Sequence, residues 1–347
     1  MSGDLLLGWD VGGAHLKRAV LDASGRLLAV DMAPCALWQG LDRLDAAIAA
    51  LPTVPAAPSV VTMTGELTDL WPDRVAGVAG LAEALAARLG DDTRFYAGPD
   101  GFMSTPDTPA YASTIASANW HATAAALALR LPAGVLVDIG STTSDLLYFA
   151  GKQLYCRGYS DCERMVAGEL LYTGAARTPV MGLGPTLPFR GAHVPLMMEY
   201  FATTADVHRL TGELPDGADL HASADGGAKT LEASARRLLR MVGRDLGPCS
   251  LAEAQALAAY AAELQVQRLH ASLALVLSAH GLTQEVPLVA AGVGRFLVPR
   301  LAQRTARGHL DAGRVLAGSE ALASAAADCA PAVAVALLAH AGGIAHG

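Results

Sequence analysis

The chain has 347 residues, of which 52% are hydrophobic and 17% charged, and its formal net charge at pH 7 is -8. This length exceeds what one hydrophobic core usually holds, so we expect a folded protein with two domains. The acidic balance argues against a nucleic-acid surface, because binding a phosphate backbone requires clustered Lys and Arg, and no stretch of the sequence supplies them.

The sequence also gives an expectation about membranes and cell compartment. Charged residues or His interrupt each apolar run before it reaches spanning length, and the N-terminus lacks the basic segment of a signal peptide. The five cysteines include no CxxC pair, which fits a reducing compartment. We therefore expect a cytoplasmic protein with no membrane partner. The sequence does not indicate an oligomeric state.

The first predicted element is an apolar hairpin. Residues 5–11 read as a buried strand, Gly12-Gly13 as a tight turn with positive φ, and residues 15–21 as a second strand. Asp10, at the strand end, can hold a metal ion or its water shell, and the bare N–H groups of the glycines can cradle phosphate oxygens. Lys17 can neutralise charge. The alternative is a simple hairpin turn without a ligand.

The following elements alternate between strand and helix. We expect a strand at 26–32, a helix at 41–51, a strand at 59–65, a helix at 78–90, a strand at 93–98 and a helix at 119–131. A dinucleotide-binding unit would run from its glycine-rich turn into a helix, whereas this chain returns as a strand. The element order therefore excludes an ordinary dinucleotide fold.

The strand-turn-strand pattern restarts in the middle of the chain. Residues 134–155 read as strand, polar turn, strand, turn and strand, and Asp138-Ile-Gly140-Ser141-Thr142 mirrors Asp10-Val-Gly12-Gly13. We expect an N-terminal domain over 1–130 and a C-terminal domain over 131–347. Two facing copies of the turn would clamp one anionic ligand between the domains.

The second half is expected to contain a helical insertion at about 163–281. Helical periodicity marks 231–245 and 251–281, while 182–195 and 210–227 are turn-rich and read as mobile surface loops. The Met197-Met198 pair is expected in the core. Residues 286–304 then read as strand, Gly292-Val-Gly294 turn and helix, where a nucleoside or phosphate could sit against the helix start.

The three glycine turns, DVGG, DIGST and AGVG, together resemble those of the acetate kinase, sugar kinase, heat-shock protein and actin superfamily. This resemblance implies an α/β fold of two ribonuclease-H-like (actin-like) domains around a phosphate-binding cleft. The segments GWDVGGAHLK, TMTGEL, VDIGSTTSDL, GYSDCERMVAGELLYTGAARTPV and AAGVGRFL more closely resemble the hydantoinase/oxoprolinase-related proteins of the tetrahydromethanopterin-linked one-carbon pathway. That family usually has Asn where this chain has His15.

This family is similar to the synthase of methanofuran biosynthesis, so the resemblance implies a transferase. The reaction would join a furanylmethyl diphosphate to the phenol of glutamyltyramine, tyramine or a tyrosine-type acceptor, with diphosphate as leaving group. Mg²⁺ would be positioned by Asp10 and Asp138, and Lys17 would pair with phosphate oxygens. The phosphate turns would be supplied by Gly12, Gly13, Gly140, Ser141, Thr142 and Thr143, with Gly292 and Gly294 as the third turn.

Four further side chains have two interpretations each. Glu66, which follows the strand at 59–65, is the candidate general base for the phenol, or else a solvated carboxylate. Asp145 assists the metal or satisfies turn N–H groups. Arg177 recognises a carboxylate or phosphate, or is a surface residue. His121 is more often a packed or capping residue than a ligand.

Two other functions stay open at this point. One is an ATP-dependent enzyme of the same fold, either a small-molecule kinase or an oxoprolinase/hydantoinase-like hydrolase, for which ATP would be the cofactor and Gly292-Val-Gly294 the adenosine contact. The other is a non-catalytic nucleotide-sensing or assembly protein, because a fold never fixes a function.

Overall fold

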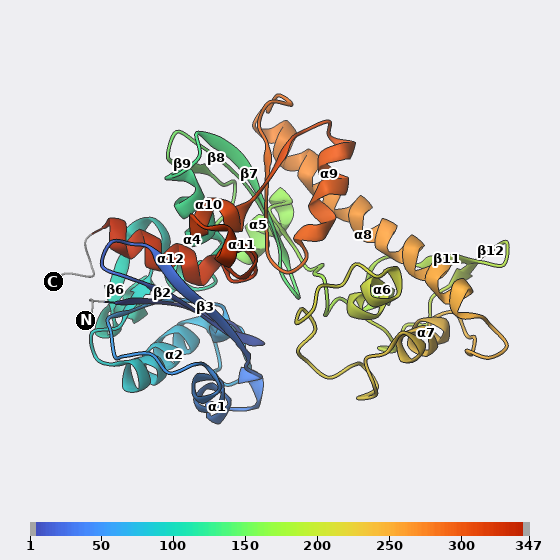
Figure 1. Cartoon of the computed structure of the whole chain (residues 1–347), viewed down its shortest axis with the longest axis horizontal. Helices are drawn as coiled ribbons and strands as arrows, with labels where there is room; N and C mark the ends of the chain where they lie inside the picture. The colour runs from blue at the N-terminus through green and yellow to red at the C-terminus, as the bar shows by residue number, and fades with distance from the viewer. Residues whose placement is uncertain (1–4, 343–347) are drawn as a thin grey trace. The chain divides into compact units, whose positions relative to one another are not determined.

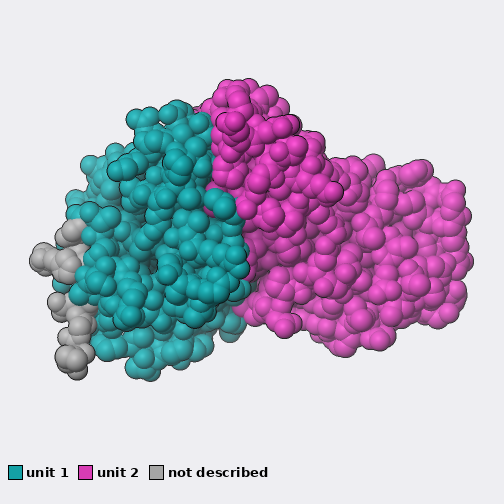
Figure 2. Space-filling model, turned by 45° about the horizontal axis from the view of Figure 1, so that its top comes forward, with its two compact units in different colours: residues 1–134, 148–155, 310–347 teal, residues 135–147, 156–309 magenta. Residues whose placement is uncertain are grey.

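The computed structural model describes residues 5–342. The chain forms two compact units: unit 1 comprises residues 1–134, 148–155 and 310–347, and unit 2 comprises residues 135–147 and 156–309 (Figure 2). The C-terminal residues thus group with unit 1, whereas the sequence placed them in the second domain. The reason is that the last long helix, α12 (Ala330–Ala341), packs on strands of the first sheet.

The first sheet has the strand order β3-β2-β1-β4-β5-β6. Its strands are β1 (Leu6–Val11), β2 (His15–Leu21), β3 (Leu27–Pro34), β4 (Ser59–Met63), β5 (Arg94–Tyr96) and β6 (Phe102–Ser104). The first three form an antiparallel meander, and β4 lies parallel to β1 on the other side. The predicted strands of the opening segment are therefore confirmed.

Helices cover both faces of this sheet. They are α1 (Asp42–Ala50), α2 (Arg74–Leu89), α3 (Ala112–Ile115), α4 (Asn119–Ala128), α10 (Ala312–Ala317), α11 (Glu320–Asp328) and α12. Trp9 and Val11 lie in a core with α1 and α2, whereas a Cβ on Gly8 would lie 2.2 Å from the Ala332 carbonyl oxygen of α12. Because strand side chains alternate between faces, Asp10 lies on the α12 face.

The second sheet repeats the plan of the first. It contains β7 (Ala133–Ile139), β8 (Ser144–Ala150), β9 (Gln153–Tyr155), β10 (Leu170–Leu171), β13 (Leu288–Ala291) and β14 (His309–Asp311). Its order is β10-β8-β7-β13-β14, with β9 also paired to β8, and β13 is parallel to β7. Both sheets thus have a central strand flanked by its hairpin partner and by a later parallel strand. This duplicated arrangement confirms the expected pair of ribonuclease-H-like sheets.

The segment between β10 and β13 carries helices and a core of its own. Here α6 (Thr204–Thr211), α7 (Leu231–Arg240) and the hairpin of β11 (Thr186–Phe189) and β12 (Ala192–Pro195) pack against the long helix α8 (Leu251–Ala279), as Figure 1 shows. The helix α5 (Asp161–Ala167) precedes β10, and α9 (Val298–Arg304) follows β13. The predicted helices at 231–245 and 251–281 are confirmed.

Two expectations for this segment are wrong. Residues 186–195 of the predicted loop form a hairpin instead, because Leu187 and Phe189 are buried at alternate positions while Arg190 and Gly191 (φ 48° and 81°) form the tight turn. Met197 and Met198 are 45% and 78% exposed, not in the core, because the chain leaves the core after the buried Leu196.

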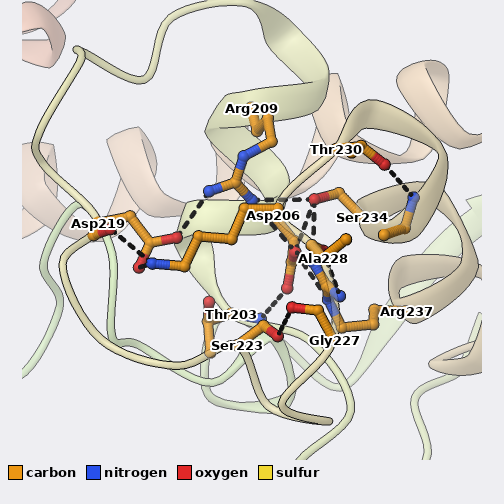
Figure 3. A network of polar contacts seen from close by, with 12 residues as sticks. Thr203, Asp206, Arg209, Asp219, Ser223, Gly227, Ala228, Thr230, Ser234 and Arg237 are labelled. Carbon is orange, nitrogen blue, oxygen red and sulfur yellow. Dashed lines mark hydrogen bonds and ion pairs between the residues drawn. The ribbon is translucent and has the colours of Figure 1, made fainter.

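A buried polar network holds α6 to α7 (Figure 3). Asp206 Oδ1 accepts hydrogen bonds from Arg237 Nη2 at 2.7 Å and from Ser234 Oγ at 2.7 Å, and Arg209 Nη2 lies 2.6 Å from Asp219 Oδ2. Because both Asp206 and Arg237 are nearly fully buried, their ion pair offsets part of the free-energy cost of removing the two charges from water.

Among residues 5–342, no single helix is long and apolar enough to cross a membrane. Only the pair α11 and α12 meets the length and composition criterion together, and its two helices are bent by 108° at their junction.

Candidate functional site

The turn after β1 is closed by one backbone hydrogen bond. The Gly12 N–H donates to the His15 carbonyl at 2.9 Å, and neither Gly12 nor Gly13 has the positive φ that the sequence predicted. The connection spans residues 12–14, so it does not need the left-handed pair of a two-residue hairpin turn. Gly12 instead provides space, because a Cβ there would lie 3.1 Å from the His15 oxygen.

The turn after β7 repeats this bond. The Gly140 N–H donates to the Thr143 carbonyl at 2.9 Å. The preceding carbonyl is also held alike in both repeats: Val11 accepts from the Thr64 N–H at 3.0 Å, and Ile139 accepts from the Gly294 N–H at 2.7 Å. The sequence repeat is therefore also a repeat of backbone geometry.

Asp10 is a buried carboxylate that is satisfied on one side. It lies opposite Lys17 on β2 and Thr62 on β4, and it is 3% exposed. Its Oδ2 lies 3.2 Å from Lys17 Nζ, while its Oδ1 has no hydrogen-bond partner among the residues that the structure describes. The structure thus brings two of the predicted site residues together and leaves one anionic oxygen available for a ligand.

The face that holds Asp10 also contains the start of α12. Cys329, the N-cap of that helix, is buried, and burial raises the pKa of its thiol to about 12; the charges of Lys17 and Asp10 act on it as well.

Glu66 is buried in the short helix η2 (Gly65–Leu67) directly after β4. Its side chain is not a solvated carboxylate, since the residue is 2% exposed and its Oε1 accepts a hydrogen bond from Ser117 Oγ at 2.8 Å. Ser117 has a left-handed backbone (φ 53°), a conformation that is costly for a residue with a side chain and is often found at functional sites. His121 lies on α4 with its Nδ1 2.8 Å from Tyr96 Oη, as expected of a packed residue.

Arg177 lies at the turn after β7. Its N–H donates to the Ser141 carbonyl at 2.8 Å, and its Nη1 donates to Thr142 Oγ1 at 3.4 Å. Arg177 therefore adds a positive charge to the predicted phosphate turn, whose Asp138 is 9% exposed.

The backbone of this turn has a defined direction. The Gly140 carbonyl accepts from the Ala175 N–H at 2.9 Å, and the Ser141 carbonyl accepts from Ala176 at 3.1 Å. In a trans peptide, the C=O of one residue and the N–H of the next point in opposite directions. The N–H groups of Ser141 and Thr142 therefore point away from residues 175–177, as donors of an anion-binding turn must.

The third glycine turn is packed against the end of β7. Gly292 has φ 79°, and a Cβ there would lie 2.3 Å from the Ile139 carbonyl oxygen. A Cβ on Gly294 would lie 2.3 Å from Ile139 Cγ2. Close packing is thus a sufficient reason for both glycines, and their role in binding phosphate or a nucleoside stays a prediction.

Asp145 has a cationic partner that the sequence did not indicate. Its Oδ1 accepts from Arg164 Nη1 at 2.9 Å, and Arg164 is 1% exposed. Burial raises the pKa of Asp145, and the charge of Arg164 opposes that shift. Neither predicted role, metal ligand or acceptor of turn N–H groups, accounts for this ion pair. No local pattern marks Arg164, because its partner is far away in the sequence.

The donors for a cation are sparse. Within residues 5–342, no group of three or more His, Cys, Asp or Glu side chains could hold a metal ion. Mg²⁺ does not need such a group, since it keeps several waters and binds one or two carboxylates together with substrate phosphates. The partnerless Oδ1 of Asp10 fits one such ligand.

The fold and the repeated turns define a protein of the actin-like class, with two ribonuclease-H-like sheets. The nucleotide-free structure of acetone carboxylase has this fold, with a TM-score of 0.56 at 11% identity over 88% of this chain and 68% of that chain. Residues 59–336 match the hydantoinase/oxoprolinase family, so the chain belongs to that family.

Two named relatives narrow the comparison. The (4-{4-[2-(gamma-L-glutamylamino)ethyl]phenoxymethyl}furan-2-yl)methanamine synthase of Methanocaldococcus jannaschii is 26% identical over 242 residues, which is 70% of this chain and 72% of the relative. The protein of the same name from Methanococcus vannielii is 29% identical over 119 residues, which is 34% of this chain and 53% of that relative. These similarities support a synthase role for the chain, and hence an enzyme that acts on small molecules.

Proposed function

We propose that this protein is an aryl-ether-forming transferase that uses a diphosphate leaving group. The observation that carries the proposal is the repeated turn geometry, in which a buried aspartate precedes a glycine whose N–H closes the turn, in a chain similar to a synthase named for a phenoxymethylfuran product. The donor would be a furanylmethyl diphosphate and the acceptor the phenol of tyramine or γ-glutamyltyramine.

In this proposal the phenol oxygen attacks the furanylmethyl carbon. The new bond is the C–O bond of the ether, the bond that breaks joins that carbon to the diphosphate, and inorganic diphosphate leaves. Glu66 accepts the phenol proton; its side chain is buried directly after β4 and is a carboxylate that can act as a general base. Ser117 orients the carboxylate by donating to Oε1.

The remaining side chains would stabilise the leaving group. The turn N–H groups of Ser141 and Thr142, together with Arg177, supply donors for phosphate oxygens, and Lys17 supplies charge at the first turn. Mg²⁺, held through the free oxygen of Asp10, would neutralise charge on the diphosphate as it departs. Asp138 has the equivalent place in the second repeat and is the second proposed ligand.

The test is incubation of the protein with Mg²⁺, a furanylmethyl diphosphate and either tyramine or γ-glutamyltyramine. Ether product by mass spectrometry, with one diphosphate released per ether and no ATP present, would support the proposal. Ether formation should stop when EDTA removes the metal. Consumption of ATP with either acceptor, and no ether, would instead indicate a kinase or an oxoprolinase-like hydrolase.

A further inference from the structure

The backbone of Gly174 packs directly against the backbone of the turn after β7. A Cβ on Gly174 would lie 2.4 Å from the Ser141 carbonyl carbon and 2.5 Å from the Thr142 nitrogen. Since these are backbone atoms, they cannot move aside as a flexible side chain could. The position of Gly174 therefore sets the position of the Ser141–Thr142 peptide, whose N–H is one of the donors in the proposed diphosphate site.

Buried side chains from the helical segment hold the Gly174 carbonyl. Gln265 Nε2 on α8 donates to this oxygen at 2.9 Å, and Thr204 Oγ1 on α6 donates to it at 2.8 Å. Both residues are fully buried. Thr178 Oγ1 lies farther from the same oxygen, at 3.4 Å. A carbonyl oxygen has two lone pairs, so the two shorter bonds use its main acceptor capacity and fix its direction.

The preceding residue is held in the same way. Thr173 Oγ1 accepts from Gln265 Nε2 at 3.1 Å, and the Thr173 carbonyl accepts from Ser144 Oγ at 2.6 Å. The Gln265 amide therefore contacts two consecutive residues of the segment that backs the turn.

The Gly174 carbonyl sets which way the Gln265 amide faces, and His208 holds the opposite end of that amide. The Gly174 carbonyl can only accept, so the Gln265 NH₂ must face it and the Gln265 Oε1 must face His208. His208 Nε2 lies 2.7 Å from Oε1 and therefore carries a proton and donates. The imidazole is completely buried, and burial lowers its pKa. The neutral tautomer with the proton on Nε2 is therefore the form that donates to Gln265.

From this chain of contacts we infer that Gln265 is a positioning residue for the diphosphate turn, held in orientation by His208. Gln265, fixed between α6 and α8, holds Gly174 in place, and Gly174 in turn fixes the N–H donors at Ser141 and Thr142. The inference rests on the proposed function and deepens it, because it names what holds one phosphate turn in its binding geometry.

The experiment compares Gln265→Met with Gln267→Met. Met has a similar length but no donor, and Gln267 lies on the same helix with an exposed side chain that contacts Glu263. The probe is inorganic diphosphate with Mg²⁺, titrated by calorimetry, together with KM for the furanylmethyl diphosphate and for tyramine. We expect Gln265→Met to weaken diphosphate binding and raise the donor KM by about tenfold, because the Gly174 carbonyl and Thr173 lose the amide donor that holds them, with the acceptor KM unchanged. Gln267→Met should resemble the wild type.

A second pair keeps the test valid if Gln265→Met does not fold. Thr204→Val removes the shortest of the three side-chain hydrogen bonds to the Gly174 carbonyl, and Thr204→Ser keeps it. Weaker diphosphate binding in the Val variant that is restored in the Ser variant supports the inference, whereas equal affinity in both overturns it.

Failure of the inference can be told from failure of the proposed function. Wild-type protein that forms ether, with variants of unchanged diphosphate affinity and donor KM, refutes the positioning role alone. Wild-type protein that binds diphosphate but forms no ether refutes the proposed reaction. The diphosphate affinity of Gln265→Met relative to that of the wild type still decides the role of Gln265. Wild-type protein that does not bind diphosphate refutes both.

Discussion

Lys17 Nζ pairs with one oxygen of Asp10 at 3.2 Å, and the second Asp10 oxygen has no partner among residues 5–342. A buried acceptor without a partner costs on the order of 1–3 kcal/mol, so this arrangement is unfavourable for the protein alone. A bound cation or its water would remove the cost. The half-satisfied carboxylate is thus a physical reason to expect a ligand at the end of β1.

Asp10→Asn should reduce ether formation by at least about 100-fold, because it removes the charge that holds the metal. Asn keeps the shape of the side chain but removes the charge that pairs with Lys17, so the melting temperature without ligand should fall, and each variant is compared with its own ligand-free value. Mg²⁺ with inorganic diphosphate should raise the melting temperature of the wild type by mass action, and of Asp10→Asn much less. Asp92→Asn, at an exposed position, is the control. Full activity in Asp10→Asn would refute the metal assignment.

Glu66→Gln should lower kcat by about 100-fold or more and leave both KM values nearly unchanged, because a general base acts on the reaction step rather than on substrate binding. Gln keeps an oxygen that can accept from Ser117 Oγ, so the fold should be preserved. Steady-state kinetics against Glu83→Gln, an exposed site on α2, would check this. A variant whose kcat equals that of the wild type would mean that another group takes the phenol proton.

Local patterns were sufficient to predict most strands of the two sheets and the positions of the repeated turns. The apolar run that ends in Asp10 and the matching run that ends in Asp138 are each read within a few residues, and both turns are closed by the same kind of bond. The hairpin at 186–195 was missed because its alternation is short and the signals of Pro and Gly dominate it.

Contacts between distant residues could not be predicted in this way. His208 and Gln265 are 57 residues apart, and Gln265 and Gly174 are 91 apart. Burial of these polar side chains follows only from the packing of α6 on α8, which no single-residue periodicity encodes. The ion pair of Asp145 and Arg164 was not foreseen for the same reason.

Arg164→Met should destabilise the protein by about 3–5 kcal/mol, because it leaves the Asp145 carboxylate buried without its cation. Adding Asp145→Asn should recover part of this loss, since the uncompensated charge is then removed. Urea unfolding at pH 7 measures both effects. Arg314→Met breaks the exposed pair of Arg314 and Glu320 and should cost less than about 1 kcal/mol. If Arg164→Met were as stable as Arg314→Met, the ion pair would contribute nothing to stability.

His208 should make the stability of the protein depend on pH in mildly acidic solution. Burial lowers its pKa in the folded state below the usual 6.5, so below that pH the unfolded chain binds a proton that the folded chain does not. The free energy of unfolding should therefore fall as pH decreases from 6.5 to the folded pKa, by up to about 1.4 kcal/mol per pH unit from this group. Above pH 6.5, His208 is neutral in both states, so it does not make the free energy of unfolding depend on pH.

His208→Gln tests this directly, because Gln can keep the donor to Gln265 Oε1 but does not titrate. We expect a smaller loss of stability between pH 6.5 and 5 than in the wild type, measured by urea unfolding at each pH. His193→Gln, at an exposed position on β12, should keep the wild-type slope. An equal slope in His208→Gln and the wild type would mean that His208 takes up its proton in the folded protein, and the neutral Nε2–H form would then not be what orients Gln265.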